Sequence, residues 1–357
     1  MRLLLSMAVL PQLKSRFVSP NVTRRTGQWP NTTLGGISLS VLAGTVVGTV
    51  AIATLSTLST ALPSLAADPF RTENPHTIDD QTEQAFNAMF RDGDYVEAQT
   101  LLETADPGEP LAHAMSAAFS YLDEDWDTLK TQYEKTLQAA AQLEASDPLR
   151  SHLYRAVGYF MEGGYIFSTE STITAIPKVL NKLSQVLNNV RAAQAIDDTD
   201  PELNLVKGYM DLLISVNLPS SDPETAIARM EAYAAPDYLV RRGVAIAYRD
   251  LKQHDDALEN VDEAIEITPN NPDLYYLRAQ ILRNKAEDLD EATQVDERAE
   301  VLQASVRSFN RAFRNHEQMP PQLAKALAYE RCRAQDRLRG RDRNCRNVAT
   351  EALQPDN

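Results

Sequence analysis

The clearest pattern of apolar and polar positions in this chain lies between Tyr238 and Leu282. Within it, two runs place apolar or small residues at steps of three and four: Val240, Val244, Ala247, Tyr248 and Leu251 in the first, and Ala257, Leu258, Val261, Ala264 and Ile265 in the second. This spacing puts the residues of each run on one face of an α-helix. The stretch therefore predicts two amphipathic helices, each of which needs a neighbour to cover its apolar face.

The ends of these helices are also visible in the sequence. The segment 268–272, Thr-Pro-Asn-Asn-Pro, ends one helix and starts the next, because proline cannot continue a helix but fits its first turn. Counted from Tyr238 as position 1, Ala245 stands at position 8, Ala257 at 20 and Ala264 at 27, and the next unit starts at Pro272 after 34 residues. Small side chains at these sites predict close helix contacts. Because one hairpin cannot cover its own apolar face, we expect an array of such hairpins.

This spacing resembles the tetratricopeptide repeat (TPR). The resemblance implies an all-α, right-handed superhelix (α-solenoid) of about six helical hairpins that ends in a C-terminal capping hairpin. We expect no sheet, since no stretch of useful length alternates with period two. Four segments are expected: 1–67 as a signal peptide or uncleaved anchor, 68–80 as a flexible lead-in, 81–320 as TPR-like repeats, and 321–357 as the cap.

Two stretches depart from the repeat pattern. Residues 161–176 contain a Gly-Gly pair, interpreted as a helix break, and a Ser/Thr-rich run before Pro177. Residues 287–300 form an acidic insertion in the sixth unit. The first is expected to be either a loop on one rim of the array or a functional feature.

Charge divides the chain at its N-terminal end. The 357 residues have a net charge of −15, yet the first 67 contain five basic and no acidic side chains. The remaining residues hold 30 basic and 50 acidic side chains, a net charge of −20. Such a balance argues against general nucleic-acid binding, which requires clustered cations.

The acid-free N-terminal segment has the three parts of a secretory signal peptide. A basic leader precedes an apolar stretch from Ile37 to about Leu62, and Ser64-Leu65-Ala66 forms a small-residue cleavage site, so the mature chain would start near Asp68. The alternative is an uncleaved membrane anchor, since 37–55 is just long enough to span a bilayer of about 30 Å. This segment is followed by an Asp-Gly-Asp-Tyr turn at 92–95, an Asp-Asp-Thr-Asp-Pro-Glu-Leu boundary at 197–203 and two cysteines near the C-terminal end. This order of features resembles exported TPR proteins of cyanobacteria, and the resemblance implies a location in the periplasm or the thylakoid lumen.

The C-terminal cap contains both cysteines and a group of arginines. Cys332 and Cys345 lie on either side of the turn at 339–341, and in an oxidising compartment a disulfide between them would join the last two helices. Seven arginines between 331 and 346 either pair with the acidic insertion 287–300 and close the array, or contact anionic lipid or an acidic partner.

The sequence contains no recognisable catalytic or metal-binding motif. The five histidines do not have metal-ligand spacing, and no glycine-rich phosphate loop follows a strand. We therefore expect a non-enzymatic scaffold without a cofactor or metal. The alternative is a hydrolase-like enzyme with its site near 161–174.

The TPR resemblance implies a groove lined by positions 2, 5, 9, 12 and 13 of each first helix. Where the register is firm, these positions hold Leu239, Arg242, Ile246, Arg249 and Asp250, and then Asp273, Tyr276, Gln280, Arg283 and Asn284. Guanidinium groups bind carboxylates through paired hydrogen bonds. We therefore expect a protein or peptide partner to bind at Arg242, Ile246, Arg249, Tyr276, Gln280, Arg283 and Asn284, and an acidic partner would suit the guanidinium groups. The chaperone-tail clamp, with Lys at position 5 and Asn at position 9, is not matched by Arg242 and Ile246.

Overall fold

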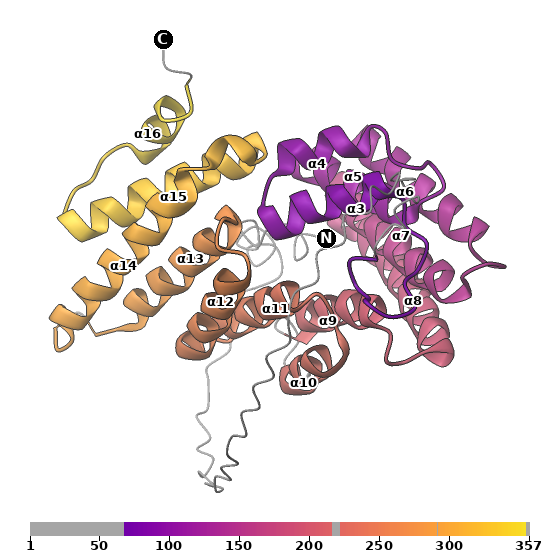
Figure 1. Cartoon of the computed structure of the whole chain (residues 1–357). Helices are drawn as coiled ribbons and strands as arrows, with labels where there is room; N and C mark the ends of the chain where they lie inside the picture. Colours follow the sequence, from indigo (N-terminus) through magenta and orange to yellow (C-terminus); the bar gives the residue numbers. More distant parts are fainter. Residues whose placement is uncertain (1–67, 216–221, 291, 355–357) are drawn as a thin grey trace, which may run out of the picture. The chain divides into compact units, whose positions relative to one another are not determined.

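The computed structural model describes residues 68–215, 222–290 and 292–354. The predicted signal peptide or anchor, 1–67, lies outside them. The described residues fold into helices without any strand, which confirms the all-α prediction (Figure 1). In chain order the elements are α3 (Asp80–Phe86), η2 (Asn87–Asp92), α4 (Tyr95–Leu102), α5 (Pro110–Leu122), α6 (Trp126–Gln142), α7 (Pro148–Thr169), α8 (Thr172–Ile196), α9 (Pro201–Ser215), α10 (Pro223–Tyr233), α11 (Asp237–Asp250), α12 (His254–Ile267), α13 (Pro272–Asp288), α14 (Val295–Phe313), η3 (His316–Gln318), α15 (Pro321–Arg339) and α16 (Cys345–Glu351). No helix in these stretches is both long and apolar enough to cross a bilayer.

Consecutive helices pack as hairpins: α5 with α6, α7 with α8, α9 with α10, α11 with α12, and α13 with α14 (Figure 1). The architecture is that of a TPR-like α-solenoid. We call the side of the array formed by α5, α7, α9, α11, α13 and α15 the first-helix face. It is the side on which the groove was predicted.

Local sequence signals set the helix starts. The side chains of Asp94, Asp125, Asp147 and Asp222 each accept a hydrogen bond from a backbone N–H in the first turn of the helix that follows. These bonds satisfy donors that have no partner within the helix. Prolines occupy the first turns of α5, α7, α10, α13 and α15, where a missing N–H costs nothing.

Small residues let the two helices of a hairpin approach closely. Ala245, Ala257 and Ala264 are fully buried, as the close contacts at positions 8, 20 and 27 predict. A Cβ atom on Gly158 would lie 2.6 Å from Leu137 Cδ2, and one on Gly208 would lie 2.8 Å from Met230 Sδ. Gly208 stands at position 8 of the unit that starts at Pro201, so the repeat spacing agrees with this close contact.

The 161–176 stretch is not an insertion, which corrects our interpretation. Helix α7 continues through Gly163 and Gly164 to Thr169, and only Glu170 and Ser171 separate it from α8. Likewise, most of 287–300 belongs to the last turn of α13 and the first turns of α14, with a short connection at 289–294. The first departure thus lengthens two helices rather than adding a loop, and the second lengthens α13 and α14 on either side of a short connection.

The segment 68–80, which we expected to be flexible, is packed against the array. Phe70 and Ile78 are buried, and the Phe70 ring contacts Phe86 edge-on at 4.9 Å between centroids. His76 Nδ1 lies 2.6 Å from Asp147 Oδ2, and Arg71 pairs with the buried Asp200. These contacts attach the lead-in to the starts of α7 and α9.

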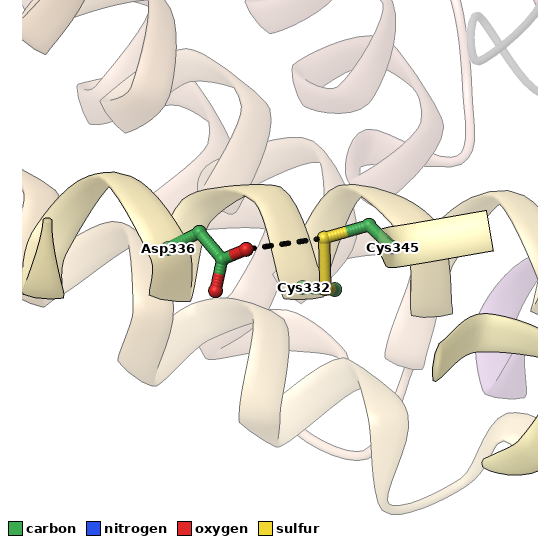
Figure 2. A group of neighbouring side chains, drawn as sticks. All are labelled: Cys332, Asp336 and Cys345. Carbon is green, nitrogen blue, oxygen red and sulfur yellow. Dashed lines mark hydrogen bonds between the residues drawn. A yellow bond between two sulfur atoms is a disulfide. The ribbon is translucent and has the colours of Figure 1, made fainter. Parts of the chain in front are cut away.

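The C-terminal hairpin contains the predicted disulfide. Cys332 on α15 and Cys345 on α16 are joined by an S–S bond, and Asp336 Oδ2 lies 3.6 Å from Cys345 Sγ (Figure 2). Because both sulfur atoms are bonded to each other, this cluster offers no thiolate to a metal ion. Arg337 of the cap pairs with Glu287 of the acidic stretch. A contact of this kind is expected if the arginines of the cap close the array.

Candidate binding site on the first-helix face

The residues predicted to line a groove are mostly buried. Arg242, Ile246 and Arg249 on α11, with Tyr276 and Gln280 on α13, are each between 3% and 6% exposed. The other two predicted residues, Arg283 and Asn284, are half-buried. In this structure the first five are therefore not accessible to a partner unless neighbouring elements move.

The polar groups of the predicted groove bind a carboxylate of the same chain. Tyr276 OH donates to Glu330 Oε1 at 2.9 Å, and Arg283 Nη1 contacts Glu330 Oε2 at 2.6 Å. Gln280 Nε2 donates to Glu330 at 3.3 Å and its Oε1 accepts from Arg249 Nη1 at 2.8 Å. The side chains thus hold an acidic group, but it is Glu330 of α15. Binding of an external partner by these residues stays a prediction.

Arg242 faces a different acceptor from the other arginines. Its Nη2 lies 3.3 Å from Asp273 Oδ2 at the start of α13, and Tyr95 OH donates to the same Asp273 oxygen. Burial raises the pKa of Asp273, while the charge of Arg242 opposes that rise. Arg242, Arg249 and Arg283 therefore do not converge on one acceptor.

The N-terminal hairpin, formed by α3, η2 and α4, covers this end of the predicted groove. Asn271 Nδ2 donates to the backbone carbonyls of Phe90 at 3.0 Å and Arg91 at 3.2 Å. At Gly93, which has φ +68°, a Cβ atom would lie 2.7 Å from both Asn271 Oδ1 and Pro272 Cδ. The turn after η2 and the start of α13 are thus in direct contact.

A second region of the first-helix face is apolar and open. It is a pocket of about 80 Å³ whose walls come from the lead-in, α3, η2, α5, α7, α9 and α11. Met161 and Leu205 lie buried in its wall, and the half-buried Phe160, Met210 and Leu213 also line it. All of its lining side chains are apolar except for the hydroxyl groups of two tyrosines. The pocket therefore suits an apolar group.

We did not predict this pocket, although the repeat register contained a signal for it. The fourth unit starts at Pro201, so Leu205, Tyr209 and Leu213 occupy positions 5, 9 and 13, which the TPR resemblance places on the groove side. All three line the pocket. The repeat register could not predict that Phe70 lines the pocket, because Phe70 belongs to the lead-in, which lies outside any repeat.

A buried ionic network holds the helix starts beside the pocket. Arg150 on α7 donates through Nε to Glu202 of α9 at 3.0 Å and through Nη2 to Glu109, before α5, at 2.7 Å. Tyr154, which lines the pocket, donates its hydroxyl to the other oxygen of Glu202. Burial raises the pKa of Glu202, opposed by Arg150. Because both oxygens of Glu202 are engaged, the network joins three helices and does not present a free acid to the pocket.

Comparison with known proteins supports the repeat assignment. Residues 246–285 match the family model of the TPR repeat. This stretch runs from the middle of α11 through α12 into α13, and it includes most of the region on which the sequence resemblance was based. The TPR resemblance is thus confirmed there, whereas similarity to exported cyanobacterial proteins stays a prediction.

Among solved structures, the chain is similar to the human IFIT1 dimer with PPP-AAAA, with a TM-score of 0.44 and 17% sequence identity. The match covers 77% of this chain and 60% of the IFIT1 chain, so this chain spans less than two thirds of that protein's length. No curated protein matches the sequence.

Proposed function

We propose that this protein is a non-enzymatic scaffold, acting outside the cytoplasm, that binds a partner protein through an apolar side chain inserted into the pocket of α5, α7, α9 and α11. The TPR match at 246–285 supports a protein-binding role of this general kind. The observation that carries the proposal is the apolar pocket, because the other candidate region already holds Glu330.

The size of the pocket favours a side chain over a larger ligand. At about 80 Å³ it is smaller than the roughly 150 Å³ apolar cavity that accommodates benzene. One aliphatic side chain of a bound segment would fill it, while the rest of the segment lies along the first-helix face. Burying such a side chain contributes about 1.5–3 kcal/mol, or roughly ten- to 150-fold in affinity.

Two features support an exported location. The cysteines form a disulfide, which persists in oxidising compartments, and the acid-free segment 1–67 resembles a signal peptide. N-terminal sequencing of the protein purified from its native cells tests this part. A mature start near Asp68 supports export, and an intact start at Met1 contradicts cleavage.

Binding is tested by selecting peptides from a random displayed library on the purified full chain. We expect enriched peptides to share a large aliphatic residue. Met210→Asp should weaken their binding at least about tenfold, because it places a charge at the pocket. The matched control is Asp211→Asn on the same turn of α9, a half-buried residue that does not line the pocket.

Two results would oppose this assignment. If Met210→Asp and Asp211→Asn bind the selected peptides equally well, the pocket is not the binding site. If the selected peptides are instead acidic and Arg283→Glu abolishes their binding, the partner displaces Glu330, and the region predicted from the sequence is the true groove.

A further inference from the structure

Helix α8 carries a row of large apolar side chains on its exposed surface. Ile173 is 86% exposed and Leu180 is 60% exposed, and Ile176 and Leu187 are also exposed. With the half-buried Leu183, these residues follow one another at steps of three, four, three and four. That is the a/d spacing of a helix that pairs with another helix along a seam. We call these five residues the α8 row.

The α8 row is additional to the face that holds α8 in the fold. Ala175, Val186 and Val190 are buried, the last two in one cluster with Ala156 of α7. On the same side, Lys182 pairs with Glu162 of α7 at 2.7 Å. Since α8 is already attached through this face, the α8 row does not serve the packing of the hairpin.

The length of the α7–α8 hairpin explains why the α8 row is uncovered. Helices α7 and α8 have 22 and 25 residues, whereas the first helices on either side, α5 and α9, have 13 and 15. At 1.5 Å per residue, α7 is about 33 Å long and its neighbours are about 20 Å. The tip of the hairpin, which carries Ile173 and Ile176, therefore extends beyond the helices on which it could lie.

We propose that the α8 row is a self-association surface, on which α8 of a second copy of this chain packs antiparallel about Leu180. This surface is independent of the pocket. The chain is acidic, with a net charge of −15, so two copies repel one another over most of their surface. Helix α8 contains no Asp or Glu, and the positions flanking the α8 row include the uncharged Pro177, Val179 and Ser184. Two copies can meet there without like charges in contact.

The direction of pairing also follows from charge. In an antiparallel pair centred on Leu180, the C-terminal part of one α8 lies beside the N-terminal end of the other, which brings Arg191 toward the turn that carries Glu170 of the second copy. Lys178 already pairs with Glu170 within one chain, and Lys182 with Glu162. A parallel pair would instead bring Glu170 toward Glu170 and Arg191 toward Arg191. The antiparallel arrangement is therefore the complementary one.

Sedimentation of the purified full chain tests the proposal, with two variants of the same charge on adjacent residues. We expect wild type to be a dimer, and Leu180→Glu to raise the dimer dissociation constant at least about tenfold, since it puts a carboxylate at the centre of the seam. Asn181→Glu, which is exposed on another side of α8, should leave the dimer intact. A monomeric wild type, or equal effects of the two variants, would overturn the proposal.

Cysteine cross-linking tests the geometry without weakening the surface. Leu180→Cys should form an intermolecular disulfide under mild oxidation, because position 180 meets its own copy, and Asn181→Cys should not. Cross-linking at 181 without cross-linking at 180 would contradict the antiparallel pair. If wild type is monomeric but co-sediments with anionic lipid vesicles, and Leu180→Glu abolishes that binding, the α8 row contacts a membrane surface and the proposal is wrong.

Discussion

Replacing Arg150 by methionine should destabilise the protein in a way that depends on pH. Arg150 is 1% exposed and lies between Glu109 and Glu202, to which it donates three hydrogen bonds. Methionine retains much of the volume but leaves two buried carboxylates without their counter-ion. Breaking a buried pair from one side costs about 3–5 kcal/mol, so we expect a loss of that order at about pH 7.

The pH dependence follows from Glu202. Burial raises its folded-state pKa, and Arg150 is the largest influence opposing that rise. A raised carboxyl pKa contributes stability below the unfolded pKa of about 4.3, and this contribution is lost as pH rises through the folded pKa. Without Arg150 the folded pKa of Glu202 moves still higher. The deficit of Arg150→Met relative to wild type should therefore be largest near neutral pH and shrink as the pH falls toward about 5.

The assay is urea unfolding at about pH 7 and about pH 5, monitored by far-ultraviolet circular dichroism. The matched control is Arg155→Met, also on α7, where the guanidinium pairs with the exposed Glu144 at 2.6 Å. This control should unfold like wild type, because exposed ion pairs contribute little. The reasoning is refuted if the two variants lose similar stability, or if the deficit of Arg150→Met is the same at both pH values.

Two further predictions concern the contact between the turn at Gly93 and the start of α13, and the disulfide of the C-terminal cap. In thermal unfolding, Gly93→Ala should destabilise the protein more than Gly340→Ala. Both glycines have positive φ, a conformation that costs an alanine roughly 1–2 kcal/mol. Only at Gly93 would the added Cβ also collide with neighbours, Asn271 and Pro272. Equal losses would show that the turn does not pack against α13 as described. Replacing Cys332 and Cys345 together by alanine should cost about 3 kcal/mol, as expected for a 13-residue separation. Insensitivity of wild-type unfolding to a reductant that demonstrably opens the bond would contradict this value.

Much of the fold could be predicted from the sequence because local interactions determine helix starts. Pro272 lies at the helix start where the repeat spacing placed it, and Asp94 and Asp125 accept hydrogen bonds from the first turns of the helices that follow them. The interpretation failed at Gly163 and Gly164, where glycine suggested a break. There α7 continues, with Lys182 Cβ of α8 3.7 Å from the place of a Cβ on Gly163. Tertiary packing along the long hairpin outweighs the low intrinsic helix preference of glycine.

The lead-in could not be predicted because its order depends on distant partners. Phe70 and His76 have no periodic pattern around them, and composition alone indicated a polar, proline-containing segment. Their contacts are with Phe86 and Asp147, the latter 71 positions from His76 in the numbering. Neither contact has a local signal.

The candidate site shows what a repeat register can and cannot predict. Three side chains of α13 that the register placed on the groove side, Tyr276, Gln280 and Arg283, hold a carboxylate of the same chain. The register could not show that the carboxylate is Glu330 of α15, because the same first-helix positions face either a ligand or the next first helix of the array. The polar region of the first-helix face is occupied by a side chain of the same chain, Glu330, and is therefore not open to a partner. The apolar pocket has no such occupant among the residues that line it. A partner that displaced Glu330 would have to replace its contacts with Tyr276, Gln280 and Arg283. A partner that entered the pocket would have no such contacts to replace.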